Sequence, residues 1–126
     1  MASKISHKED TLQCIVAILL DNMVKMGKVA VWFHIANEFV GNIFQGVLRK
    51  KKGVKKGIPD NYILLPNGQH FFIELKVENN KMSLEQEQYK KRFNNANIEV
   101  FVCRTPEEVK QVVLNFYRKD EKNCTN

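Results

Sequence analysis

Apolar side chains recur at three- and four-residue spacing in two segments of the chain, and this period predicts amphipathic helices. This spacing is clear over residues 7–26 and weaker over 42–53. Further helices are expected from Ser83 to about Asn95 and after Thr105, where a cap, a proline and two acids mark a helix start. In the first segment, Ser6 and Glu9 have the spacing of an N-terminal capping box, and Gly27 follows the last turn. We therefore expect three helices and a fourth, shorter one.

Shorter apolar runs have the length and composition of β-strands. They cover residues 29–35, 61–66, 69–77 and 98–104. The second and third runs flank Asn67-Gly68, a dipeptide typical of β-hairpin turns. The resulting order, α-β-(α)-β-β-α-β-α, predicts an α/β fold in which a mixed β-sheet is flanked by helices.

The length of 126 residues suits a single domain, which we place over residues 1–126. Its core is expected at about 7–117, with a polar, frayed tail over 118–126. Lys and Arg number 20 and Asp and Glu 14, giving a net charge of +6. A basic balance fits a polyanionic partner, although simple solubility would produce it as well.

The apolar run at residues 14–20 is too short to span a membrane, so no membrane partner is expected. The three cysteines, Cys14, Cys103 and Cys124, lack metal-ligand spacing. Cys14 and Cys103 lie in apolar runs and are interpreted as small core residues. This usage favours a reducing, cytoplasmic setting.

Charged residues in the hairpin indicate chemistry, because burying a charge is costly unless something binds it. Side chains alternate along a strand, so Glu74 and Lys76 share a face, while Asp60 stands at the start of the partner strand. Two carboxylates, with the Leu75 carbonyl as a further candidate ligand, suit Mg²⁺ or Mn²⁺. Lys76 can hold or deprotonate a water molecule, or offset charge on phosphorus. Such a set can hydrolyse a phosphodiester, whereas an isolated E-x-K is more often a surface ion pair.

The register of the hairpin decides whether the two acids meet. A plain two-residue turn at Asn67-Gly68 would place Asp60 opposite Leu75, on the opposite face from Glu74. A shift by one residue in either direction brings Asp60 onto the face of Glu74. We therefore predict a three-residue loop with a left-handed residue at or beside Gly68, a bulge near Asp60, or an Asp60 that precedes the paired strand.

Three short motifs, GIPD at 57–60, IELK at 73–76 and SLEQ at 83–86, together resemble the VRR-NUC family. These virus-type replication–repair nucleases form part of the PD-(D/E)xK superfamily. The likeness extends over about residues 7–113 and includes Glu9 and Gln13 on the first helix. It also includes HIAN at 34–37, although this chain has alanine where the family often has proline.

The resemblance implies a restriction-endonuclease-like core and a catalytic set made of Glu9, Asp60, Glu74, Lys76 and Gln86. Asp60 and Glu74 would bind the metal, and Lys76 would position or activate the water. Gln86 would orient that water or contact the substrate backbone, and Glu9 would complete the outer shell or bind a second ion. Glu9 and Gln86 also fit capping boxes, and for Gln86 the two interpretations are about equally supported.

Six of the eight residues at 49–56 are basic and lead directly into the GIPD motif. They are Arg49, Lys50, Lys51, Lys52, Lys55 and Lys56. Such a run is usually a solvated face, but its connection to the motif places it beside the site. We therefore predict salt-sensitive, sequence-independent contacts with nucleic-acid phosphates.

The sequence thus predicts a metal-dependent, structure-selective DNA endonuclease that acts on branched DNA such as four-way junctions or flaps. It is expected to be a homodimer, because one small domain offers one site and junction resolution takes two symmetric cuts. No organic cofactor is expected. The alternatives are a non-catalytic DNA-binding protein with a nuclease fold, and an RNA-directed nuclease.

Overall fold

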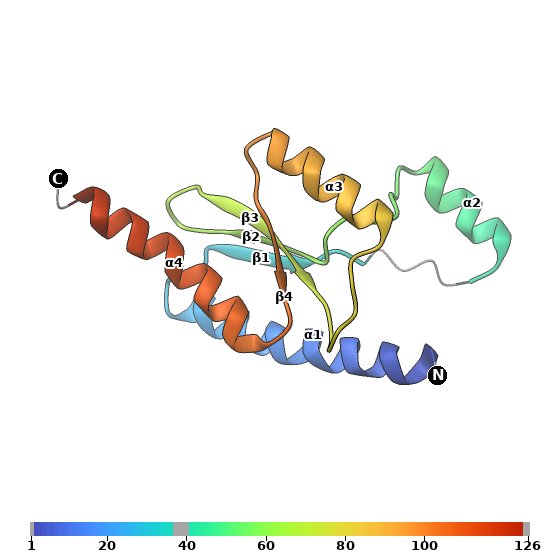
Figure 1. Cartoon of the computed structure of the whole chain (residues 1–126), viewed down its shortest axis with the longest axis horizontal. Coiled ribbons are helices and arrows are strands. Elements are labelled where there is room, and N and C mark those ends of the chain that lie inside the picture. The colour runs from blue at the N-terminus through green and yellow to red at the C-terminus, as the bar shows by residue number, and fades with distance from the viewer. Residues whose placement is uncertain (1, 37–40, 125–126) are drawn as a thin grey trace.

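The computed structural model describes residues 2–36 and 41–124, and the side chains of residues 7–36 and 41–118 among them (Figure 1). Within these described ranges, four helices and four strands follow the predicted order. They are α1 (Ala2–Lys25), β1 (Val31–His34), α2 (Ile43–Lys51), β2 (Asn61–Leu64), β3 (His70–Leu75), α3 (Leu84–Asn95), β4 (Val100–Cys103) and α4 (Pro106–Cys124). The segment over 42–53, with its weak helical spacing, therefore does form a helix.

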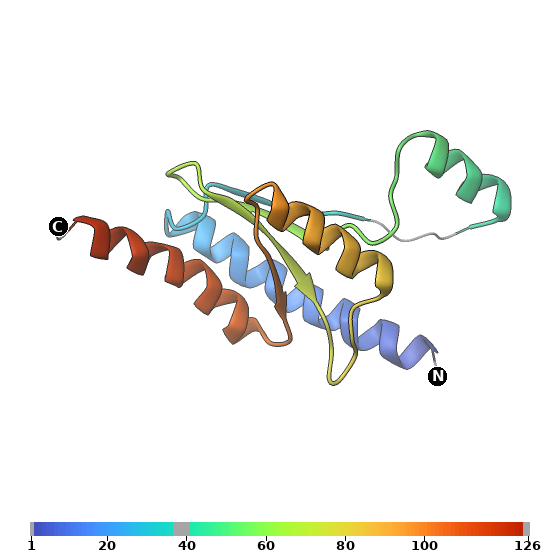
Figure 2. The same cartoon turned by 45° about the horizontal axis from the view of Figure 1, so that its top comes forward.

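The four strands make one mixed sheet with the spatial order β1-β2-β3-β4. The first three strands are antiparallel, and β4 runs parallel to β3. A parallel neighbour needs a crossover, which α3 supplies between β3 and β4. In Figures 1 and 2, α1 and α4 cover one face of the sheet and α3 the other, whereas α2 projects away from the body. The predicted fold class is confirmed.

The main core lies between the sheet and the pair α1 and α4. Its helical part includes Leu12, Val16, Leu20, Val109 and Val113, and its sheet part includes Ile63, Leu65, Phe71, Ile73 and Leu75. Inside the described part of the chain, we find no helix with the length and apolarity that crossing a membrane requires.

Three local predictions are corrected. Helix α1 begins at Ala2, so Ser6 lies within the helix and the predicted Ser6–Glu9 capping box is wrong. Helix α4 continues to Cys124, so most of the predicted frayed tail is helical. Cys103 is buried as predicted, but Cys14 is exposed, because it lies two residues from the buried Leu12 and points to the opposite side of α1.

Candidate active site

The β2–β3 hairpin has the register that the site requires. Asn61 pairs with Ile73, one residue away from the register of a two-residue turn. The Leu65 N–H donates to the carbonyl of Gln69 at 2.8 Å across a three-residue loop, and Gly68 adopts a left-handed φ of 89°. Of the three arrangements that the sequence left open, the structure has the three-residue loop, and this loop sets the face on which the next residues lie.

Continued by one step, this register places Asp60 opposite Glu74. The Asp60 N–H donates to Glu74 Oε2 at 3.1 Å, and the Leu75 N–H donates to Asp60 Oδ2 at 2.9 Å. On the other side, the Ile35 N–H donates to the Asp60 carbonyl at 2.6 Å. Asp60 is therefore fixed between β1 and β3, and the two predicted carboxylates lie together.

Glu74 is only 2% exposed and contacts two further predicted residues. Gln86 Nε2 donates to Glu74 Oε1 at 2.7 Å, and Lys76 Nζ lies 4.0 Å from the same oxygen. The Lys76 side chain is itself 12% exposed. The structure thus brings four of the five predicted catalytic residues into one group, around a carboxylate that is almost removed from solvent.

Gln86 forms the capping box that its sequence position suggested and also contacts Glu74 of the candidate site. Its Oε1 accepts from the Ser83 N–H at 2.8 Å, and its own N–H donates to the Ser83 hydroxyl oxygen at 3.2 Å. These two bonds form the capping box at the start of α3. Because the amide oxygen is held by Ser83, the amide nitrogen is left facing Glu74.

Burial dominates the electrostatics of the two carboxyls. Burial and, to a smaller extent, the nearby Asp60 charge raise the pKa of Glu74 to about 8, while Lys76 opposes the shift. Burial also raises the pKa of Asp60, against the lowering effects of the Leu75 N–H, His34 and Lys76. Two adjacent carboxyls that resist ionisation would be stabilised by a bound cation. Perturbed acids of this kind are typical of functional sites.

A small cavity of about 60 Å³ adjoins Asp60. It is lined by Glu9, Asp10, Gln13, His34, Asp60 and Leu75. The fifth predicted residue, Glu9, therefore reaches the same cavity as Asp60, from α1. The sequence interpretation placed His34 only at a strand end, but its position opposite Asn61 brings it to the site. The predicted HIAN turn continues to Asn37, which lies outside the described residues.

A pair of amides lies beside the site: the sequence interpretation named Gln13 but missed its partner Asn61. Gln13 Nε2 donates to Asn61 Oδ1 at 2.9 Å, and Asn61 Nδ2 donates back to Gln13 Oε1 at 3.0 Å. Asn61 has no exposed surface and is in phase with the core residue Ile63. A polar residue in a core position was the sequence feature that could have revealed it. The pair joins α1 to β2, and its members follow Glu9 by four residues and Asp60 by one residue in the chain.

The ligand atoms available here suit a hard divalent cation. Among the side chains that the structure describes, no three Asp, Glu, His or Cys groups converge on a metal position. The site instead offers the two carboxylates of Asp60 and Glu74. Mg²⁺ is commonly held by one or two carboxylates and keeps several waters, whereas structural zinc needs four nitrogen or sulfur ligands. The donor set therefore fits Mg²⁺ or Mn²⁺.

The basic run begins in the last turn of α2 and ends beside α3. Its lysines are exposed and Arg49 is half-buried. Lys56 Nζ lies 3.9 Å from Glu85 Oε1, and a Cβ built on the following Gly57 would be 2.8 Å from the Glu85 backbone. The loop therefore packs tightly on the first turn of α3, next to Gln86. One end of the run is at the site, and the other extends along α2.

Comparison with known families identifies one match. The family model described as the VRR-NUC domain matches residues 5–106. This span contains all five predicted catalytic residues and the whole basic run. Comparisons with curated proteins and with solved structures gave no match.

Proposed function

The chain belongs to the VRR-NUC family, a family of nucleases, and from that premise we propose a metal-dependent endonuclease that cuts branched DNA, such as four-way junctions or flaps. The observation that supports it is the pairing of Asp60 with Glu74 across the hairpin, beside Lys76 and Gln86. A protein that only bound DNA would have no need of buried acids at a surface that meets phosphates.

Each residue has a distinct task in this proposal. Asp60 and Glu74, with the Leu75 carbonyl, would hold Mg²⁺ or Mn²⁺, which when bound polarises a phosphoryl oxygen and acidifies a water. Lys76 holds the attacking water or offsets charge that grows on phosphorus. Gln86 keeps Glu74 oriented, and Glu9 completes the outer shell of the metal from α1.

The assignment is tested with labelled junction, flap, duplex and single-stranded DNA and a matching RNA, each with Mg²⁺, Mn²⁺ or EDTA. We expect cleavage of junction or flap with either metal and none with EDTA. Binding without cleavage of any substrate would favour the non-catalytic alternative. Faster cleavage of RNA would favour the RNA-directed one.

We predict that the metal-free protein loses stability as the pH rises. The pKa of Glu74 is about 8 in the folded chain against an ordinary value of 4.5, so the folded chain keeps a proton that the unfolded chain releases. This contribution is fully present below about pH 4.5 and is lost as the pH approaches about 8, at a cost on the order of a few kcal/mol. Thermal unfolding measured across this range checks the prediction.

Added Mg²⁺ should raise the melting temperature more at about pH 8 than at about pH 5.5, because metal binding requires deprotonated carboxylates. In Glu74→Gln, both the pH dependence and the response to Mg²⁺ should largely disappear. A response to Mg²⁺ of wild-type size in this variant would exclude Glu74 as a ligand.

The basic run is proposed to contact DNA phosphates. Replacing the three lysines at 50–52 by glutamine should reduce the slope of log affinity against log salt by about 0.9 per lost contact on duplex DNA. The control removes three exposed charges elsewhere, at Lys25, Lys110 and Arg118, and should leave the slope nearly unchanged. Equal slopes in wild type and the 50–52 variant would mean that the run is only a solvated face.

We further propose a cytoplasmic setting, which the cysteine usage favours. We also propose a homodimer, since the described residues hold one catalytic group and junction resolution takes two cuts. Helix α2 offers a surface for pairing, because Ile43 and Phe44 are 87% and 78% exposed and none of its described residues is buried. Sedimentation should show a dimer that Phe44→Asp disrupts. The same change at the exposed Ile18 on α1 should not. A monomer, both free and on a junction, would favour a flap or nick as substrate.

A further inference from the structure

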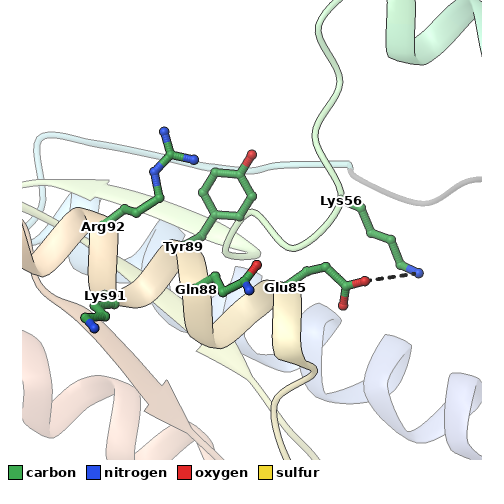
Figure 3. A pocket seen from close by; sticks show the side chains of 6 residues that line it. All are labelled: Lys56, Glu85, Gln88, Tyr89, Lys91 and Arg92. Atoms are coloured by element: carbon green, nitrogen blue, oxygen red, sulfur yellow. Dashed lines mark ion pairs between the residues drawn. The ribbon is translucent and has the colours of Figure 1, made fainter.

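A cavity of about 490 Å³ lies beside α3 (Figure 3). It is lined by Lys56, Glu85, Gln88, Tyr89, Lys91 and Arg92. Its lining includes Glu85, the residue before Gln86. A second cavity, of about 250 Å³, is lined by Tyr89, Arg92, Phe93 and Ala96. The two cavities share Tyr89 and Arg92, so they follow one another along α3 from Glu85 to Ala96, over ~17 Å.

An aromatic ring and a guanidinium stand at the junction of the two cavities. The Arg92 guanidinium carbon lies 5.3 Å from the centre of the Tyr89 ring. Figure 3 shows that both side chains rise from the same side of α3, while Lys56 extends from the neighbouring loop toward Glu85. Tyr89 is only half-buried. The cavities therefore present a flat aromatic group together with a planar cation, both accessible from solvent.

The lining is predominantly cationic. Lys56, Lys91 and Arg92 outnumber the single carboxylate of Glu85, which lies 3.9 Å from Lys56 Nζ. A groove with excess positive charge attracts a nucleic-acid backbone, and an aromatic side chain within it offers a stacking partner for a base. Arg92 can attract the phosphates through its charge and can stack on a base through its planar guanidinium.

The position of the cavities joins them to the candidate active site. Glu85, at their near end, directly precedes Gln86, whose amide donates to Glu74. Gly57 packs on the backbone of both Glu85 and Gln86 and so holds the Lys56 loop in place. A DNA strand that is cut beside Glu74 would therefore contact Lys56 first and Tyr89 one helical turn further along α3.

We propose that Lys56, Tyr89, Lys91 and Arg92 form a subsite for an unpaired strand of the substrate, in which a base stacks on Tyr89 and phosphates contact the cations. The proposal rests on the proposed nuclease function, since the strand is the one that continues from the cut bond. Paired bases are stacked on one another inside a duplex and cannot offer a face to Tyr89. The subsite therefore selects substrates with unpaired nucleotides, such as flaps, over intact duplex.

Binding without metal tests the subsite independently of cleavage. In EDTA, Tyr89→Leu should bind a short single strand about 10-fold or more weakly, while its duplex affinity stays within about twofold. Tyr89→Phe keeps the ring and should bind like wild type. Circular dichroism and thermal unfolding establish that each variant is folded. Single-strand affinity equal to wild type in a folded Tyr89→Leu would overturn the proposal.

The cation is tested separately. Arg92→Gln should reduce the salt slope on single strands by about 0.7, the value for one phosphate contact. Lys110→Gln removes an equal charge from α4 and should leave the slope unchanged. Equal slopes for the two variants would remove Arg92 from the subsite.

A photocross-link locates the base directly. A single strand carrying 5-iodouracil should attach to the tryptic peptide at residues 82–90, in which Tyr89 is the only aromatic residue. Attachment only to other peptides would overturn the proposal. If wild type cuts no DNA but shows this cross-link, the subsite stands and the nuclease assignment fails. If it cuts DNA and Tyr89→Leu binds single strands normally, only the subsite fails.

Discussion

Replacing Glu74 by glutamine is expected to lower the rate of branched-DNA cleavage by at least about 10²–10³-fold, while DNA affinity stays within about threefold. Glutamine keeps the size of the buried side chain and leaves a carbonyl to accept from Gln86, but it removes the charge that would bind the metal. Asp60→Asn should act in the same way. Single-turnover cleavage and equilibrium binding, measured on one junction and one flap, separate the two effects.

The control for these variants is Glu99→Gln. Glu99 is an exposed carboxylate beside β4, so the same chemical change there should leave cleavage at the wild-type rate. Lys76→Gln should resemble Glu74→Gln if the ammonium stabilises charge or holds water at the reacting phosphate. Full cleavage by either carboxylate variant would show that the hairpin carboxylates are not required for catalysis.

The hairpin shows how far the sequence could specify the site. Alternation placed Glu74 and Lys76 on one face, and the need for Asp60 to join them excluded the plain two-residue turn. A shift in either direction would have satisfied that need, because residues that differ by two share a face. The choice between the shifts was made by loop conformation, in which Gly68 adopts a left-handed φ of 89°. Strand alternation alone could not supply this choice.

Other features depended on tertiary contacts that a local pattern does not contain. A cap at Ser6 is worth about 1 kcal/mol, and a helix that continues to Ala2 competes closely with it. The proximity of His34 to Asp60 arises from the pairing of β1 with β2, which is non-local. The Gln13–Asn61 pair likewise joins residues 48 positions apart in the chain. These two non-local contacts are invisible in residue spacing, although each adjoins a motif that the sequence did identify.

The glycine of the GIPD motif is expected to be needed for both stability and cleavage. Gly57 has a φ of 95°, which strains any L side chain, and an added Cβ would lie 2.8 Å from the Glu85 carbonyl carbon and 3.0 Å from the Gln86 nitrogen. Because both are backbone atoms, the first turn of α3 or the loop itself must move. Gln86 would then lose its alignment with Glu74. We expect Gly57→Ala to reduce cleavage by ~10- to 100-fold.

Gly53 provides a matched control for the strain. Its φ is 97°, but an added Cβ meets no atom within 4 Å. Gly53→Ala should therefore cost ~1–2 kcal/mol of folding free energy for the left-handed backbone alone, with little change in cleavage. Gly57→Ala should cost at least ~1 kcal/mol more, since its close contact adds overpacking to the same strain. Denaturant unfolding and cleavage of both variants give the comparison. Equal losses in the two variants would show that the loop does not position α3, and that glycine is needed at 57 for its backbone conformation only.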